Sequence, residues 1–387
     1  MRLKNIYLDN GASTKVDLKV LDTMLPYLKN RYGNASSIHT FGFEAKTMLD
    51  NSRKIIAKSL NAKEEEIIFT SGGTESNNLT IKGLAFANKN KKNHIITTKV
   101  EHKCILNSCK WLETQGFKVT YLGVDKEGFV NPKNLEKAIT KKTILVSIIH
   151  GNNEIGTIQD LEKLGLICKE HSVYFHTDAC QSYTKTELDV EKQHLDLVTI
   201  NSHKIHGPKG VGALYIRKGT KITPLLHGGD HEFKMRAGTE NISGIIGFAK
   251  AAQIALNKKH VKKMTVLRDK LISEVLKIPD VKLNGPKGKE RLCNNANFSF
   301  KGAEGEAIGG YLDQKFICSS TGSACSEKTL EPSYVLQAIG LSHEEANGSL
   351  RLTLSRFTTE EEINYTIKVL PKIIKKLRRM SPIWKSR

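Results

Sequence analysis

Residues 197–210 have the sequence Leu-Val-Thr-Ile-Asn-Ser-His-Lys-Ile-His-Gly-Pro-Lys-Gly. The first four are apolar or β-branched, which predicts a short strand over 197–200. Lys204 follows in a loop that contains glycine and proline. Ligands bind beyond the carboxyl ends of the strands in an open parallel sheet. The stretch therefore predicts an α/β fold in which Lys204 faces a cleft.

Strand and helix patterns alternate through the first two-thirds of the chain. We expect further strands over 67–70, 94–98, 118–122, 143–149, 173–177 and 212–216, with helices from about Glu75, over 103–114 and over 133–139. This alternation predicts a mainly parallel sheet with helices on both faces.

The pattern changes after residue 242. It predicts longer helices over 244–255 and 261–276, short strands over 297–300 and 350–354, and a last helix from Thr358 or Thr359, where Glu361 and Glu362 suit a capping box. We therefore expect a large domain over 15–257, and a small α+β domain built from 1–14 and 258–387.

Composition limits the class of protein. The 387 residues are 39% hydrophobic and 26% charged, which is typical of a folded globular chain. The apolar runs have only the length of a strand, so we expect no membrane span. The N-terminus lacks the apolar segment of a secretory signal, so we expect no such signal. Seven cysteines without a Cys-x-x-Cys pair argue against a disulfide framework or a zinc ribbon. We expect a cytoplasmic protein without a metal site.

The net charge of +20 has two interpretations. Residues 366–387 carry eight basic and no acidic side chains, which suits a nucleic acid or another acidic partner. A lysine-rich solvated surface explains the same charge. The sequence favours the second interpretation, because no nucleic-acid motif accompanies the basic residues.

Two further sites complement Lys204. Asp178 ends another predicted strand, and Ser71-Gly72-Gly73-Thr74 forms a glycine-rich turn into a helix. Free N–H groups at such a turn bind anions. A lysine, an acid and a phosphate cradle are what pyridoxal phosphate requires. Together they predict a site for that cofactor.

The chain resembles the cysteine desulfurases of the NifS/IscS type, within the class-V aminotransferase-like enzymes of fold type I. The resemblance is carried, in order along the chain, by residues 7–12, 32–39, 70–78, 101–103 (Glu-His-Lys), 152–156 (Asn-Asn-Glu-Ile-Gly), 236–241 (Arg-Ala-Gly-Thr-Glu-Asn) and 322–325 (Gly-Ser-Ala-Cys). It implies a large domain with a mainly parallel seven-stranded sheet and a smaller α+β domain.

The resemblance also implies roles around the cofactor ring. Lys204 would form the Schiff base and then move protons. Asp178 would keep the pyridine nitrogen protonated, which makes the ring an electron sink. Gln181 would donate to the ring hydroxyl oxygen. His102 would stack on the ring and assist proton transfer.

Phosphate and substrate contacts follow from the same resemblance. The phosphate would be bound by Gly73, Thr74, Ser202 and His203, and by Thr239 from the other subunit of a homodimer. Because Asn201-Ser202 replaces the commoner Ser-Ala, it stays open whether Asn201 or Ser202 supplies that contact.

The carboxylate of the substrate would be held by Asn153, which also contacts the cofactor, and by Arg351. We rank Arg351 above Arg356 because Arg351 aligns with the family's carboxylate-binding arginine. An arginine offers a bidentate fork to a carboxylate, which a lysine cannot reproduce.

The implied sulfur acceptor is Cys325. L-cysteine would replace Lys204 on the cofactor, and the Cα proton of the bound L-cysteine would be removed. The Cys325 thiolate would then attack the substrate sulfur. The products are L-alanine and a persulfide on Cys325. The sulfur would pass to an iron–sulfur scaffold protein or to tRNA thiolation. It stays open whether Cys325 also shares a [2Fe–2S] cluster with a scaffold, and whether the protein contacts tRNA.

Three alternatives remain at this point. A related enzyme could act on selenocysteine or cysteine sulfinate, although neither reaction needs the Cys325 thiol. An inactive nucleic-acid-binding or scaffold protein could retain the fold, although Lys204, Asp178, His102 and Cys325 are all present. His203 and His206 could suggest a metal, but no Cys or His set has ligand spacing.

Overall fold

The structure is a computed structural model that describes residues 5–322, 332–381 and 384. A seven-stranded sheet has the order β2-β8-β7-β6-β5-β3-β4. Its strands are β2 (Ile67–Thr70), β3 (His94–Thr98), β4 (Lys118–Leu122), β5 (Thr143–Ser147), β6 (Tyr174–Asp178), β7 (Leu197–Asn201) and β8 (Gly212–Ile216). All neighbouring pairs are parallel except those that β8 makes with β2 and β7. This is the mainly parallel sheet that the sequence predicts.

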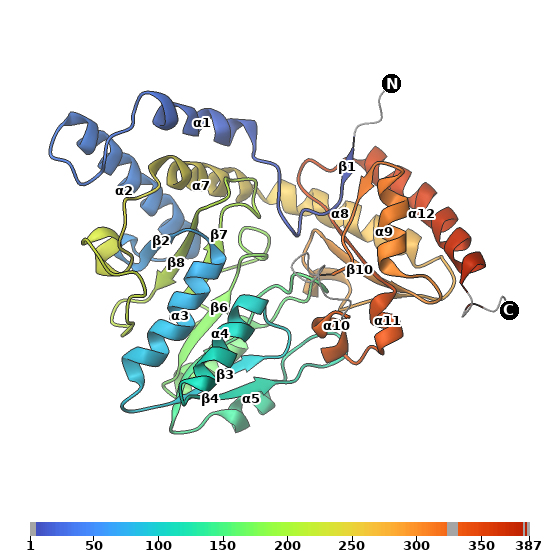
Figure 1. Ribbon diagram of the computed structural model, residues 1–387, viewed down its shortest axis with the longest axis horizontal. Coiled ribbons are helices and arrows are strands. Elements are labelled where there is room, and N and C mark those ends of the chain that lie inside the picture. The colour runs from blue at the N-terminus through green and yellow to red at the C-terminus, as the bar shows by residue number, and fades with distance from the viewer. Residues whose placement is uncertain (1–4, 323–331, 382–383, 385–387) are drawn as a thin grey trace.

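Helices bury both faces of this sheet (Figure 1). One face packs against α2 (Thr40–Leu60), α5 (Pro132–Ala138), α6 (Leu161–Glu170) and α7 (Ile242–Ala255), with α1 (Leu18–Lys29) lying on α7. The other face packs against α3 (Gly73–Asn88) and α4 (Lys103–Thr114). Adjacent residues such as Leu197 and Val198 enter opposite cores, which explains why the strands are continuously apolar.

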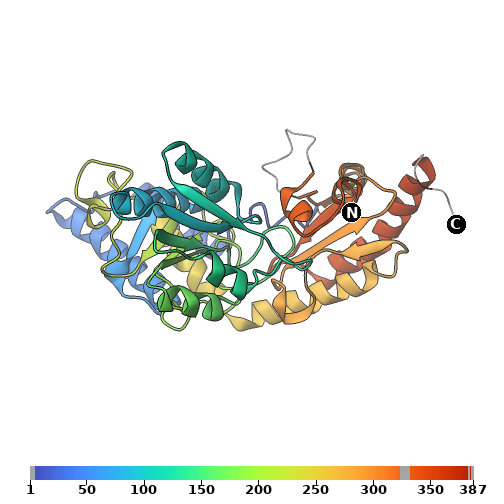
Figure 2. The same ribbon diagram turned by 90° about the horizontal axis from the view of Figure 1, so that it is seen from below.

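A second core surrounds a smaller antiparallel sheet, in the order β12-β10-β9. Its strands are β9 (Val281–Leu283), β10 (Asn295–Phe300) and β12 (Ser349–Thr353), packed with α8 (Lys258–Val275), α9 (Gly305–Asp313) and α12 (Glu360–Met380). Strands β1 (Ile6–Tyr7) and β11 (Ile317–Cys318) form a parallel pair beside it. Figure 2 shows the two parts next to each other, with α8 running along one side.

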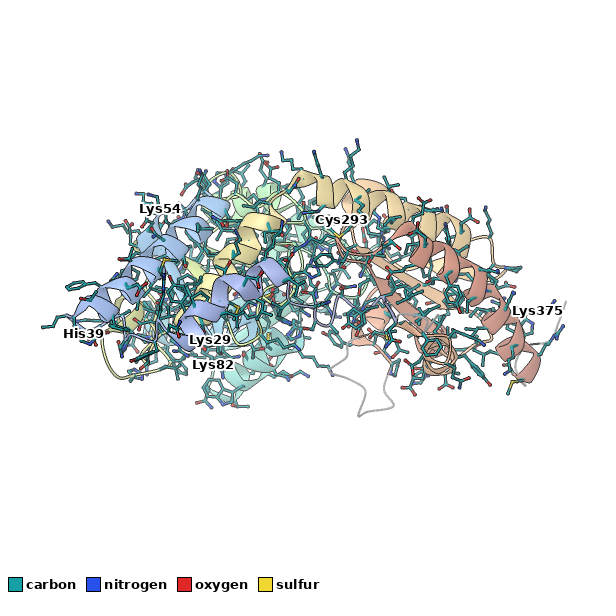
Figure 3. The ribbon with its side chains drawn as sticks, turned by 90° about the horizontal axis from the view of Figure 1, so that it is seen from above. Lys29, His39, Lys54, Lys82, Cys293 and Lys375 are labelled. Carbon is teal, nitrogen blue, oxygen red and sulfur yellow. The ribbon has the colours of Figure 1, made fainter. Side chains whose placement is uncertain are left out.

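Shorter elements complete the chain. Helices α10 (Tyr334–Ala338) and α11 (His343–Asn347) pack against Val100, Ile149 and Ile155 of the large part. Three short 3₁₀ segments are η1 (Glu64–Glu66), η2 (His231–Lys234) and η3 (Gly288–Glu290). Cys293, labelled in Figure 3, is buried just before β10. Among the described helices, none has both the length and the apolar character needed to cross a bilayer.

Most predicted elements are present, with different ends. The capping box at Thr359 and Glu362 is confirmed. Helix α3 begins at Gly73 rather than near Glu75, and β5 ends at Ser147 rather than residue 149. Residues 148–149 lie past the last paired strand residue, so an apolar run alone overestimates the strand. The predicted domain limits of 15–257 and 258–387 stay a prediction.

Candidate active site

A cavity of about 260 Å³ lies at the carboxyl edge of the large sheet. The C-terminal ends of β2, β3, β5, β6 and β7 meet at this edge because these strands run in one direction. The cavity is lined by Gly11, Ala12, Gly73, Thr74, Asn77, His102, Cys104, Ile149, Asn153, Asp178, Cys180, Gln181, Asn201, His203, Lys204 and Arg351. The structure therefore gathers most of the predicted site residues in one place.

The N-terminus of α3 forms one wall of the cavity. Gly72 is its N-cap with φ +153°, a backbone conformation that favours glycine, and no side chain caps the helix. The first N–H groups of a helix have no partner within the helix, so they are available to an anion. A Cβ on Gly73 would lie 2.6 Å from Cys180 Sγ, so the narrow space here suits glycine.

Asp178 lies at the end of β6 and is buried. Its Oδ2 accepts a hydrogen bond from Asn77 Nδ2 at 2.7 Å, and its Oδ1 accepts one from the backbone N–H of Cys180 at 2.9 Å. These donors hold the carboxylate at a fixed orientation on the cavity wall. A buried carboxylate in this position can stabilise a protonated ring nitrogen.

Lys204 lies in the loop after β7, with its Nζ inside the cavity. The Nζ donates to the backbone carbonyl of Ala12 at 2.6 Å and to that of Gly11. Burial and the positive charge of Arg351 lower the pKa of Lys204 to about 8. About a tenth of the amine is therefore neutral at pH 7 and about half at pH 8, and the neutral form is the one that bonds to a carbonyl carbon.

Arg351 enters the cavity from β12 of the small sheet. Its Nη2 lies 3.1 Å from Asp9 Oδ1, and its Nη1 donates to the carbonyl of Asn153 at 3.1 Å. Arg356 instead pairs with Asp17 at 2.5 Å and lines a different hollow. The geometry thus places Arg351, and not Arg356, in the cavity at the carboxyl edge of the sheet.

Of the other predicted site residues, some line the cavity and some do not. Gln181 Nε2 donates to the carbonyl of Gly11 at 2.8 Å, and His203 Nδ1 lies 3.2 Å from Ser13 Oγ. Burial and the nearby Lys204 lower the pKa of His203 to about 4. Ser202 is buried and is not among the residues that line the cavity, whereas Asn201 is.

Thr239 also lies outside this cavity. It lines a separate hollow together with Arg236, whose Nε lies 3.0 Å from Glu75 Oε1. Although burial raises it, hydrogen bonds from Arg236 and Ser71 hold the pKa of Glu75 below its usual value. The loop that carries Thr239 is therefore bound to the first turn of α3 through Arg236 and Glu75. Thr239 does not line the cavity of the same chain.

Cys325 lies outside the described residues, as do the rest of residues 323–331. The described residues next to this segment lie near the cavity. Ser320 exchanges two backbone hydrogen bonds with Arg351, at 2.6 and 3.2 Å. On the other side of the segment, Ser333 Oγ donates to Glu154 Oε2 at 2.5 Å.

The cavity suits a polar, anionic cofactor. Within the described part of the chain, the buried atoms Asn77 Oδ1, Asn153 Oδ1, Asn201 Oδ1 and Arg351 Nε have no hydrogen-bond partner. A buried polar atom without a partner costs free energy, so a ligand that supplies hydrogen-bond partners here would stabilise the site. The helix N-terminus, the buried acid and the lysine fit pyridoxal phosphate.

Cys104, Cys180 and Asn77 line the cavity, and none of them was among the predicted site residues. Asn77 connects to Asp178 and Cys104, and it lies within residues 70–78, one of the stretches that carry the family resemblance. Position was a further signal, because Asn77 lies one turn into α3 and Cys104 lies two residues after His102.

Comparison with known proteins agrees with this geometry. The family model described as aminotransferase class-V matches residues 6–366. A solved structure of a NifS-like protein matches with a TM-score of 0.91 at 38% identity, covering 96% of this chain and 100% of that one. Fold and site together define a class-V aminotransferase, a class of pyridoxal phosphate enzymes of fold type I.

Sequence relatives narrow the group. A cysteine desulfurase IscS of Dictyoglomus turgidum is 54% identical over 98% of this chain and 97% of its own length. A cysteine desulfurase IscS of Methanosarcina thermophila is 51% identical over 98% of this chain and 94% of its own length. The chain belongs to the class-V aminotransferase family and, within it, to the cysteine desulfurases of the IscS type.

Proposed function

We propose that this protein is a pyridoxal phosphate-dependent L-cysteine desulfurase. In the overall reaction L-cysteine and the Cys325 thiol become L-alanine and a persulfide on Cys325. The C–S bond of the substrate breaks, an S–S bond forms, and a hydrogen replaces sulfur on the β-carbon. The observation that carries this proposal is the single cavity in which Lys204, Asp178 and Arg351 face the N-terminus of α3.

Each of these groups has a defined task. Pyridoxal phosphate, when bound, supplies an aldehyde for the amine and a ring that withdraws electrons from Cα. Asp178 holds the proton on the ring nitrogen. Arg351 binds the substrate carboxylate, with Asn153 beside it. Lys204 accepts the Cα proton, because burial already keeps part of its amine neutral.

The phosphate is proposed to lie at the N-terminus of α3, against Gly73 and Thr74, with His203 nearby. Asn201 is favoured over Ser202 for the contact left open by the sequence, because Asn201 lines the cavity and Ser202 does not. An amide can rotate to present its Nδ2 to an anion.

The acceptor is proposed to be Cys325. Support comes from the described residues on both sides of its segment, since Ser320 pairs with Arg351 and Ser333 bonds to Glu154. The six described cysteines are all free thiols, and burial raises the pKa of Cys104 to about 12 and that of Cys293 to about 11. Thiols with raised pKa values are poor nucleophiles.

We propose that two copies of the chain form the active enzyme. Large apolar side chains are exposed between α1 and the start of α2, where Tyr32 is 76%, Ile38 90% and Phe43 62% exposed. Such a patch is unusual on a monomer and indicates a protein interface. Thr239, which lies outside its own cavity, would then complete the phosphate site of the second copy.

Sulfur is proposed to leave Cys325 for an iron–sulfur scaffold protein or another acceptor, in a reducing cytoplasm. A tRNA contact is a second candidate. The exposed residues Lys368, Lys372, Lys375, Lys376 and Arg379 follow helical spacing along one face of α12. Figure 3 shows Lys375 on the outer side of this helix. Such a stripe would bind a polyanion with steep salt dependence.

The test is alanine formation from L-cysteine under reducing conditions. The wild type should form alanine and sulfide in equal amounts. Cys325→Ala should lose this activity while it keeps the absorption band of the bound cofactor. If a cofactor-loaded wild type formed no alanine from L-cysteine, the proposal would be wrong, and formation from selenocysteine or cysteine sulfinate would identify the alternative.

A further inference from the structure

The ring of His102 is bound through one specific nitrogen. His102 is the N-cap of α4, and its Nδ1 accepts the backbone N–H of Cys104 at 3.2 Å. A backbone N–H can only donate, so Nδ1 carries no proton in this arrangement. Burial lowers the pKa of His102, which favours the neutral ring, and a ring with a bare Nδ1 is not the imidazolium cation. A neutral ring with a bare Nδ1 has its proton on Nε2.

The thiol of Cys104 makes a second contact with the same nitrogen. Cys104 Sγ lies 2.9 Å from His102 Nδ1. Because Nδ1 is an acceptor, the S–H must be the donor. Burial and the charge of Asp178 raise the pKa of this thiol to about 12, so it retains the proton that this contact needs.

Asn77 extends the contact to the opposite wall of the cavity. Its Nδ2 donates to Asp178 Oδ2 at 2.7 Å and to Cys104 Sγ at 3.2 Å. The Asp178 carboxylate can only accept a hydrogen bond, so the Asn77 side-chain atom that faces it must be the amide nitrogen and not the oxygen. Asn77 therefore donates to Asp178 on one side of the cavity. On the other side it donates to the thiol of Cys104, which in turn donates to His102.

We propose that Cys104 and Asn77 are positioning residues that fix His102 in its Nε2–H tautomer and couple its orientation to Asp178. His102 then presents a donor from Nε2 and cannot take a proton there, so the base role falls to Lys204. The same geometry excludes Cys104 as a second sulfur carrier, since its thiol is committed as a donor. This inference rests on the proposed function only for its kinetic consequences.

The test uses ¹⁵N-histidine NMR on the purified holoenzyme without substrate. The signal of His102 is assigned by its loss in His102→Asn. We expect the wild type to show the Nε2–H tautomer. Cys104→Ala should raise the pKa of His102 by roughly half to one pH unit, because loss of a neutral donor no longer favours the neutral ring. Cys104→Ser retains a donor and should restore the wild-type value.

The charged groups that act on His102 are Asp178 from β6, Lys204 from the loop after β7 and Lys103 from α4. None of these charged groups changes in the Cys104 variants, so a change in the pKa of His102 reports the loss of the thiol. Cys109→Ala is the matched control, because Cys109 lies in α4 and packs in the core behind the sheet. It should leave the His102 signal unchanged.

Kinetics supply a second readout. Cys104→Ala should lower kcat by about tenfold with little change in KM, and Cys104→Ser should recover most of it. A bare Nε2 in the wild type, or an unchanged pKa in Cys104→Ala, would overturn the inference. If the NMR result holds but L-cysteine gives no alanine, the proposed function fails and the tautomer assignment stands.

Discussion

Two groups of buried polar side chains differ in how completely they are hydrogen-bonded. Arg268 and Arg291, behind the small sheet, are each 1% exposed, and their guanidinium groups bind the carbonyls of Gly288, Arg291 and Leu292, and of Pro286 and Asn284. The cavity wall, by contrast, retains unpartnered buried atoms within the described chain.

This difference suggests that the buried arginines contribute to the stability of the fold, whereas the cavity residues contribute to ligand binding. Donors used within the chain stabilise the fold, and their loss leaves carbonyls unsatisfied. Unpartnered polar groups on residues that line the cavity can bind a ligand there. Variants of the arginine cluster should therefore change the free energy of unfolding, and variants of the cavity should change binding and rate.

Lys204→Ala is expected to have the largest effect. Alanine formation should fall by roughly 10³-fold or more, because both the covalent link and the proton acceptor are lost. The melting temperature of the apoprotein should change little. Single-turnover alanine assays and thermal melts check this, with Lys209→Ala, an exposed lysine of the same loop, as control. Retained turnover in Lys204→Ala would contradict the assignment of the base.

Arg268→Met should lower the free energy of unfolding by about 3 kcal/mol, because three backbone carbonyls lose their donor. Chemical unfolding measures this. Turnover per folded molecule should stay at the wild-type value. Lys282→Met, which removes an exposed pair with Glu345, should shift stability by no more than about 0.5 kcal/mol. A similar loss in both variants would show that burial is not the cause.

Arg351→Lys should weaken binding of the substrate carboxylate. The lysine keeps the charge but not the bidentate fork, so we expect KM for L-cysteine to rise by about 10- to 30-fold. Initial-rate kinetics measure this change. Arg356→Lys lies outside the cavity and should leave KM near the wild-type value. Equal effects of the two substitutions would contradict the placement of the carboxylate beside Arg351.

The pH dependence of cofactor uptake tests the environment of Lys204. Its pKa is lowered to about 8, so the neutral amine of the apoprotein increases with pH up to that value. The rate at which apoprotein binds pyridoxal phosphate should therefore rise about tenfold per pH unit below 8 and level off above it. Stopped-flow absorbance follows this rate. A rise that continues to pH 10 would show an unperturbed lysine.

Local sequence patterns predicted much of the fold, but not the direction of every strand or which side chains border the cavity. The apolar strands and the capped helix α12 were predictable because periodicity and capping are local. The antiparallel placement of β8 was not, since both faces of the sheet are buried and its strands show no alternation. For the same reason, nothing in the sequence indicates that Asn201 rather than its neighbour Ser202 borders the cavity.

Contacts between elements were the least predictable. Lys204 and Asp178 could be assigned because strand ends meet at one edge of a parallel sheet. The link from Asn77 through Cys104 to His102 depends on how α3 packs against α4, which one sequence does not specify.

Thr359→Ala should have the smallest effect, about 1 kcal/mol, because it removes one half of a capping box. Thr359 Oγ1 accepts the N–H of Glu362 at 3.3 Å, and Thr359 N–H donates to Glu362 Oε2 at 2.9 Å. Thr359→Ser keeps the hydroxyl and should retain most of the stability. Because neither residue lines the cavity, kcat and KM should not change. A lowered kcat in the alanine variant would show that α12 is coupled to the cavity, and the separation between stabilising and ligand-binding groups would then fail.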